Sequence, residues 1–196
     1  MPDHSGKGRA LTVETTAIEG LLIIRWDTHG DDRGFFRQTY QRAELAEALG
    51  REPVFAQGNH SRSAPGVIRG FHAEPWDKLV YVVRGTAMAA IADIRPQSST
   101  FGQVVTHHLG DAPGERCRLF ISEGLANSFC TYGEQTVDYL YDVSDVWRPD
   151  IDKPAIAWND PDLAVTWPID EPSLSDADAK NATLRELFPD HARFSR

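Results

Sequence analysis

The sequence lacks the features that mark several large classes of protein. Its 196 residues include only two cysteines, Cys117 and Cys130, which are too few for a disulfide framework or a zinc cluster. The longest apolar runs, 21–24 and 79–83, are far shorter than the roughly 18 to 20 residues that span a membrane. No apolar core follows the charged N-terminus, as it would in a signal peptide. We therefore expect a cytoplasmic protein with reduced thiols.

Positive charge is also scarce. The chain has 20 Lys and Arg against 29 Asp and Glu, a net charge of −9, which would repel nucleic acid unless the cations were clustered. With 41% hydrophobic and 25% charged residues, the composition is ordinary for a globular chain. We expect a single domain over residues 1–196, in which 1–10 form a flexible start, 20–170 the main body and 173–188 a helical C-terminal segment.

Short runs of β-type residues, bounded by turn residues, fill most of the chain. Their number and spacing predict an all-β fold, either a two-sheet sandwich or a barrel. The run 78–83 is apolar on both faces, which predicts a strand that is covered on both sides. The predicted strands are 21–26, 35–40, 54–59, 67–74, 78–83, 86–94, 102–109, 116–122, 137–142 and 155–158.

Two segments have helical signals instead. Residues 43–49 place their apolar side chains at helical spacing and stop at Gly50, a residue suited to the left-handed conformation that ends helices. Near the C-terminus, Ser173 or Ser175 could cap a helix that runs to Leu187 and is stopped by Pro189. We expect both helices to lie at the periphery of the β fold.

The segment 66–74 is the most unusual in the chain, because a β-type run carries an Arg, two Gly and a His. If it is extended, one face carries Ile68, Gly70, His72 and Glu74. An imidazole and an arginine, with Lys78 on the next strand, would suit an anionic ligand whose chemistry needs a base near neutral pH. The alternative is structural: His72 is a core histidine with a satisfied hydrogen bond, and Arg69 pairs with Glu74.

Tyrosine and histidine spacing bears on acid catalysis and on metal binding. Tyr139 and Tyr141 share one strand face, and either phenol could act as a general acid or simply pack as a strand residue. None of the seven histidines has the i, i+2 spacing that puts two imidazoles on one face of a strand. We therefore expect no metal and no cofactor.

Several motifs in order along the chain resemble those of the dTDP-4-dehydrorhamnose 3,5-epimerase family. The resemblance covers about residues 20 to 180, and it rests on a set of motifs rather than on one. They are Asp32-Arg33-Gly34-Phe35-Phe36, Gln57-Gly58-Asn59-His60-Ser61-Arg62-Ser63, Gly66-Val67-Ile68-Arg69-Gly70-Phe71-His72, Lys78-Leu79-Val80, Asp93-Ile94-Arg95, Thr100-Phe101-Gly102, Trp158-Asn159-Asp160-Pro161, Trp167-Pro168 and Leu174-Ser175.

The resemblance implies a cupin-type jelly roll that works without metal as a homodimer, with an N-terminal strand added to the partner's sheet. It implies a dTDP-4-keto-6-deoxyhexose substrate, inverted at carbons that flank the ketone. His72 would be the base, Asp178 its orienting carboxylate and Tyr141 the acid. Lys78 would stabilise the enolate oxygen. The residues expected to contact the nucleotide sugar are Arg33, Phe36, Gln38, Gln57, Asn59, Arg69, Asn127 and Trp147.

Five positions depart from the family pattern. Asn127 replaces a His, Gln38 a Glu, Ala177 a Lys, Ala89 an Asp and Val146 a Tyr. We interpret these changes as leaving the proton-transfer residues in place while altering the substrate preference. Such a protein could act at only one carbon or on another deoxysugar. Two alternatives stay open: a family member that binds a nucleotide sugar without epimerising it, and a metal-dependent cupin oxygenase or isomerase.

Overall fold

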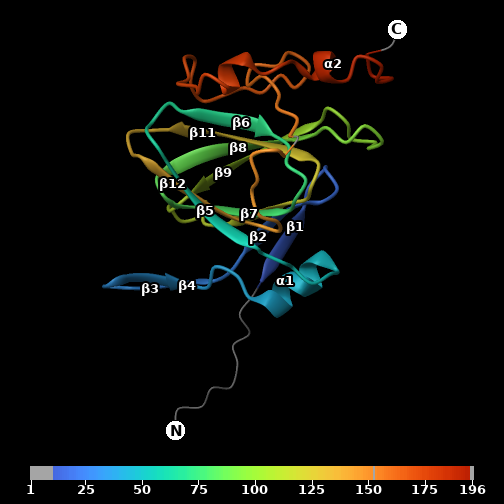
Figure 1. Cartoon of the computed structure of the whole chain (residues 1–196). Helices are drawn as coiled ribbons and strands as arrows, with labels where there is room; N and C mark the ends of the chain where they lie inside the picture. Colours follow the sequence, from blue (N-terminus) through green and yellow to red (C-terminus); the bar gives the residue numbers. More distant parts are fainter. Residues whose placement is uncertain (1–10, 152, 195–196) are drawn as a thin grey trace.

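Two antiparallel sheets stack face to face in the computed structural model, which describes residues 11–151 and 153–194 (Figure 1). This arrangement confirms the predicted two-sheet jelly roll; the expected flexible start, residues 1–10, lies outside the described residues. The six-stranded sheet has the order β1 (Thr12–Thr15), β2 (Leu21–Arg25), β10 (Arg118–Ile121), β7 (Lys78–Arg84), β12 (Val137–Val143) and β5 (Gln57–Ser63). The four-stranded sheet has the order β6 (Ile68–His72), β11 (Leu125–Tyr132), β8 (Thr86–Asp93) and β9 (Val104–Gly110).

The main core lies between these two sheets. Val80 and Val82 of β7 and Leu119 of β10 face Ala89 and Ile91 of β8, and all are buried. The small side chains of β8 let the sheets approach closely, since close packing leaves little room for voids. Toward the β5 edge, side chains of β5, β6, β11 and β12 line the polar cavity described below.

Both sheets are also covered on their outer faces. The C-terminal segment lies over the four-stranded sheet (Figure 1, orange to red), where Phe71 and Ala90 pack against Ile156 and Leu163. On the other side, helix α1 (Arg42–Leu49) places Leu45 against the outer face of the six-stranded sheet, in a cluster with Leu79 and Phe120. Coverage of this kind confirms that 78–83 is buried on two sides over much of its length.

Helix α1 confirms the prediction for 43–49, and it ends at Gly50 with φ of 66°. The prediction of one continuous C-terminal helix is wrong. The segment forms only a 3-10 turn, η1 (Asp178–Lys180), and a short helix, α2 (Leu184–Leu187). Thr183 starts a new capping box with Glu186, and this break leaves the chain between the two pieces extended. The residue that precedes the first piece is Ala177, not Ser173 or Ser175, although Ser175 Oγ accepts a hydrogen bond from the Asp178 N–H at 3.0 Å.

Three strands of the structure were not predicted, and one predicted strand is not formed. The missed strands are β1, β11 and β3 (Thr28–Asp31), which pairs with β4 (Gly34–Arg37) as a separate hairpin. Strand β11 shows no alternation because it is buried on both faces, and its polar side chains bond to backbone: the Ser128 hydroxyl donates to the Arg69 carbonyl at 2.9 Å. Residues 155–158, predicted as a strand, make only isolated bridges.

None of the described helices is long and apolar enough to cross a membrane.

Candidate active site

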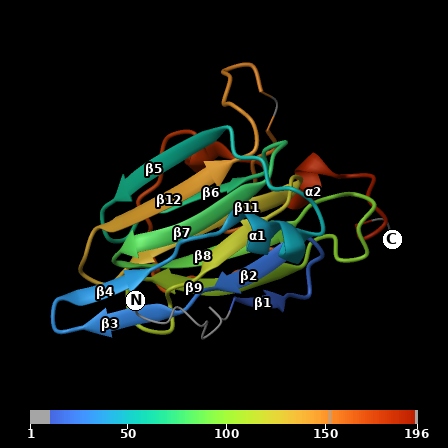
Figure 2. The same cartoon turned by 90° about the horizontal axis from the view of Figure 1, so that it is seen from below.

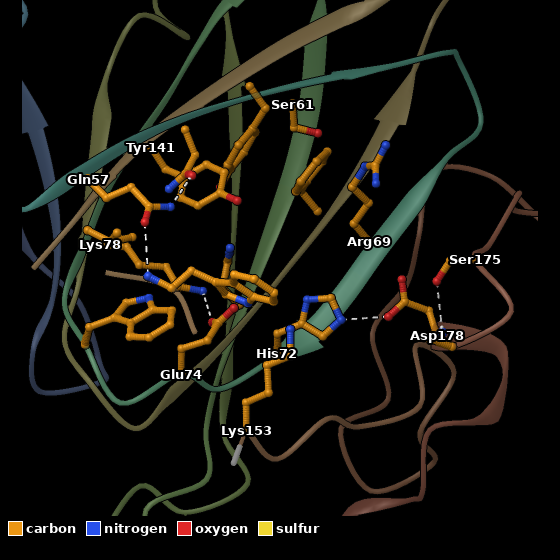
Figure 3. Close-up of a pocket in the computed structure, with 18 residues that line it drawn as sticks. Gln57, Ser61, Arg69, His72, Glu74, Lys78, Tyr141, Lys153, Ser175 and Asp178 are labelled. Atoms are coloured by element: carbon orange, nitrogen blue, oxygen red, sulfur yellow. Dashed lines mark hydrogen bonds and ion pairs between the residues drawn. The ribbon is translucent and has the colours of Figure 1, made fainter. Parts of the chain in front are cut away.

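A cavity of about 600 Å³ opens between the two sheets at the β5 edge (Figure 3). Register explains which side chains face it from the six-stranded sheet: Asn59 of β5 lies opposite Tyr141 of β12, and Gln57 and Lys78 both lie opposite Val143. The cavity brings together all four predicted catalytic residues and five of the predicted binding residues. These are His72, Asp178, Tyr141 and Lys78, with Gln57, Asn59, Arg69, Asn127 and Trp147.

His72 and Asp178 form a pair on one wall of the cavity. The distance from His72 Nε2 to Asp178 Oδ1 is 2.7 Å, and the Asp178 side chain is only 7% exposed. The start of η1 holds the aspartate, whose N–H donates to Ser175 Oγ. Because Nε2 is engaged with the carboxylate, Nδ1 is the ring nitrogen left to act on a ligand.

Arg69 also lines the cavity, although it does not share strand alternation with His72. The predicted face of Ile68, Gly70, His72 and Glu74 is formed only in part: His72 and Glu74 both line the cavity, but Ile68 and Gly70 do not, because the pairing of β6 with β11 shifts register between Asn127 and Phe129. Ile68 is instead fully buried in the interior. The register shift turns the chain, so two residues three apart reach one space.

The proposed pairing of Arg69 with Glu74 is also wrong. The Arg69 Nε donates to Ser63 Oγ at 3.0 Å, whereas Glu74 forms an ion pair with Lys78. The Lys78 side chain is 5% exposed and that of Glu74 is 13% exposed, so this is a nearly buried ion pair that faces the cavity (Figure 3). Burial lowers the pKa of Lys78, and the charge and hydrogen bond of Glu74 oppose that effect.

Both tyrosines of β12 line the cavity, on the wall that carries Lys78. Burial raises the pKa of Tyr141 most, and the negative charge of Glu74 raises it further, so the Tyr141 hydroxyl carries a proton at neutral pH. Tyr139 is more deeply buried and stacks on Phe129 with ring centroids 4.1 Å apart. Burial raises the pKa of Tyr139, and hydrogen bonding with the Asn127 side chain opposes that effect, while Asn127 Oδ1 itself has no partner among the described residues.

Three predicted binding residues lie outside this cavity in a single chain. Arg33 and Phe36 are on the β3–β4 hairpin, which extends outward from beneath the six-stranded sheet, and Gln38 follows it (Figures 1 and 2). The Arg33 side chain is 90% exposed and is paired with its neighbour Asp31. The role of these three residues in binding the nucleotide sugar therefore stays a prediction.

The pocket substitutions are also spread through the structure. Ala177 lines the cavity next to Asp178, whereas Ala89 is fully buried in the core and Val146 is exposed. Sequence reasoning missed Lys153 as a lining residue, and it gave Glu74 no role in the pocket. Alternation along β5 could have found Ser61, because it shares a face with Gln57 and Asn59.

Residues 11–151 and 153–194 contain no group of three or more His, Cys, Asp or Glu side chains placed to hold a metal ion. The polar groups of the cavity include an imidazole–carboxylate pair, a lysine–carboxylate pair and two phenols. Such a set can move protons and stabilise an oxyanion.

Comparison with known proteins agrees with this chemistry. The family model for dTDP-4-dehydrorhamnose 3,5-epimerase matches residues 15–186. The dTDP-4-dehydrorhamnose 3,5-epimerase of Pseudomonas aeruginosa is 39% identical over 179 residues, which cover 88% of this chain and 97% of that protein. A dTDP-4-dehydrorhamnose 3-epimerase of Streptomyces niveus is 34% identical over 185 residues, with 89% and 87% covered.

Among solved structures, that of the Legionella pneumophila epimerase in complex with dTDP-4-keto-L-rhamnose superimposes with a TM-score of 0.83. It is 34% identical, and the match covers 90% of this chain and 94% of that one. The matched fold, the length of the sequence match and the chemistry of the cavity lead to one conclusion. This chain belongs to the dTDP-4-dehydrorhamnose 3,5-epimerase family.

Proposed function

We propose that this protein epimerises a dTDP-4-keto-6-deoxyhexose by removing and returning a proton at a carbon next to the ketone. One observation carries the proposal: the His72–Asp178 pair and the Tyr141 and Lys78 side chains come from different walls of one cavity (Figure 3). Inversion needs a base and an acid on opposite faces of the sugar ring. This arrangement supplies both, with a cation beside them.

The steps follow from the groups present. Asp178 accepts the Nε2–H of His72, which leaves the Nδ1 lone pair to take the proton from carbon. The electron pair of the C–H bond moves to the ketone oxygen, and the ammonium group of Lys78 stabilises the resulting enolate. Tyr141 then gives its phenolic proton to the opposite face of that carbon as the ketone re-forms. The imidazolium and the phenolate return to their starting states by proton exchange with solvent.

We assign the nucleotide and sugar oxygens to the polar groups near the mouth of the cavity. Arg69 supplies a charge-assisted donor, and Gln57 and Asn59 supply amides. Gln57 also accepts from the backbone N–H of Trp147 at 3.0 Å, which holds that exposed ring at the rim, where a base can stack on it.

We further propose that the protein works as a homodimer in which each β3–β4 hairpin reaches the partner's cavity. The hairpin exposes two aromatic rings, Phe35 and Phe36, and in the part of the chain that the structure describes, β5 is an edge strand of its sheet, next to the cavity. Adding the hairpin to that edge would cover both and bring Arg33, Phe36 and Gln38 to the nucleotide. Strand exchange thus explains why a single chain leaves these residues outside its own pocket.

Mixed dimers test this arrangement. Arg33→Ala and His72→Asn chains, each inactive alone, are mixed in equal amounts and allowed to exchange subunits. Half of the dimers are then mixed, and one of the two sites in each is intact, so about a quarter of wild-type activity is expected to return. No recovery, despite exchange shown by native mass spectrometry, would mean that each hairpin serves its own chain.

Substrate preference is the part of the proposal that the substitutions affect most. Asn127 and Ala177 both line the cavity, so the pocket differs from the family pattern close to the base and to its aspartate. We propose that these changes favour inversion at a single carbon, an activity that the name of the Streptomyces niveus relative also describes. The positions at which solvent deuterium enters the sugar would show whether one carbon or two react.

Solvent exchange also tests the reaction itself. Incubation with a dTDP-4-keto-6-deoxyhexose in deuterated water should introduce deuterium next to the ketone, and His72→Asn should abolish this while dTDP binding stays nearly intact. His108→Asn is a matched control, because that histidine bonds to Tyr132 on the surface, away from the cavity. Sugar binding without exchange in the wild type would instead favour a protein that binds nucleotide sugars and does not epimerise them.

We place the protein in the cytoplasm, where nucleotide sugars are made and thiols stay reduced. Burial raises the pKa of both Cys117 and Cys130 to about 11. The two thiols are therefore unreactive core residues rather than candidate nucleophiles.

A further inference from the structure

Glu74 is a cavity residue that the proposed reaction does not use. It lies between β6 and β7, two residues after His72 and four before Lys78, and its carboxylate is in contact with the Lys78 ammonium. Both side chains are nearly buried, and both face the reaction space (Figure 3). We propose that Glu74 is a positioning residue that keeps Lys78 charged and Tyr141 protonated at alkaline pH, an inference that rests on the proposed function.

The first step of the argument is the cost of burying Lys78. An ammonium group removed from water tends to lose its proton unless an anion lies next to it. In this structure burial lowers the pKa of Lys78, Lys153 lowers it further, and Glu74 opposes both effects through its charge and its hydrogen bond. A neutral lysine would stabilise an enolate far less well, so the reaction depends on this contact.

The second step concerns the other groups that face Lys78. The titratable and charged side chains around the cavity are Arg69, His72, Glu74, Tyr139, Tyr141, Lys153 and Asp178. Only two of these are carboxylates, and Asp178 is already bonded to His72. Glu74 therefore provides the negative charge on the side of the acid and the cation. Its charge also raises the pKa of Tyr141, after burial, while Arg69 lowers it.

Direct titration of the lysines tests the first half of the proposal. The sequence has only four lysines, at positions 7, 78, 153 and 180, so lysine labelled with carbon-13 at Cε gives few resonances. Lys78→Arg identifies the signal of Lys78. In Glu74→Gln the midpoint of this signal should move to lower pH by about one unit or more. In Glu74→Asp, which keeps a carboxylate, the midpoint should return most of the way to its wild-type value. Glu47→Gln, an exposed change on helix α1, is the control.

The pH profile of deuterium exchange tests the second half. Glu74→Gln should exchange at about the wild-type rate near pH 6.5 and about tenfold more slowly than the wild type near pH 9. The reason is that Lys78 and Tyr141 lose their protons at lower pH without the Glu74 charge. An unchanged Lys78 midpoint, or an equal loss of rate at every pH, would overturn the proposal. If the wild type shows no exchange at all, the proposed function fails, while the lysine titration still decides the role of Glu74.

Discussion

Removing the carboxylate behind the candidate base is the most informative single change. In Asp178→Asn the side chain keeps its shape but loses the charge that lies 2.7 Å from His72 Nε2. Two unit charges about 4 Å apart interact by about 4 kcal/mol at an effective dielectric constant near 20. The His72 side chain is 29% exposed, so solvent screens part of this interaction. We expect the barrier to proton abstraction to rise by about 2 to 4 kcal/mol, which slows exchange by about 30- to 1000-fold.

The assay is deuterium entry into a dTDP-4-keto-6-deoxyhexose, followed by proton NMR at matched enzyme concentration, with dTDP affinity measured separately by calorimetry. Asp162→Asn is a suitable control, since this aspartate pairs with Arg185 in the C-terminal segment and does not line the cavity. The control should exchange within about twofold of wild type. An Asp178→Asn rate within about threefold of wild type, with the fold intact by circular dichroism, would refute the assignment of His72 and Asp178 as a catalytic pair.

Three further outcomes follow from the packing. Tyr139→Phe removes a buried hydroxyl whose polar neighbour is the Asn127 side chain and keeps the stacking on Phe129, so the free energy of unfolding should change by less than about 1 kcal/mol in thermal unfolding; a loss above about 2 kcal/mol would contradict this. Gly70→Ala should cost about 2 to 4 kcal/mol and impair exchange, because φ is +106° and a Cβ would lie 2.4 Å from the Asn127 carbonyl oxygen. Burial raises the pKa of Asp93, but hydrogen bonds outweigh burial and hold it at about 2. Ionised Asp93 therefore stabilises the fold fully above about pH 4, and this contribution is lost as the pH falls toward 2. Acid unfolding should show a loss of about 2 kcal/mol in the free energy of unfolding over this range, and Asp93→Asn should not show it.

The strands that the sequence predicts well are those in which period-two alternation or a wholly apolar run meets a turn residue. Strands β7 and β12 are examples, because burial of their side chains is what selects both the pattern and the strand. Strand β11 was missed because Ser128 and Thr131 are buried and bond to the backbone of β6 and of the loop after β5, a condition that exists only after the sheets form. The prediction of a continuous C-terminal helix was wrong for a similar reason, since Asp178 of η1 bonds to His72 of β6 and Leu184 of α2 is buried in the cluster over the four-stranded sheet.

Local patterning and motif spacing were enough to establish the all-β architecture and the family, and with them which imidazole, carboxylate, phenol and amine to examine. Those signals lie along the chain, so they need no knowledge of distant contacts. Only the tertiary structure decided that Glu74 contacts Lys78 rather than Arg69, and that the β3–β4 hairpin stays away from its own chain's cavity. Both outcomes depend on sheet register and on the path of the chain through space, where a shift of one residue changes which side chains meet.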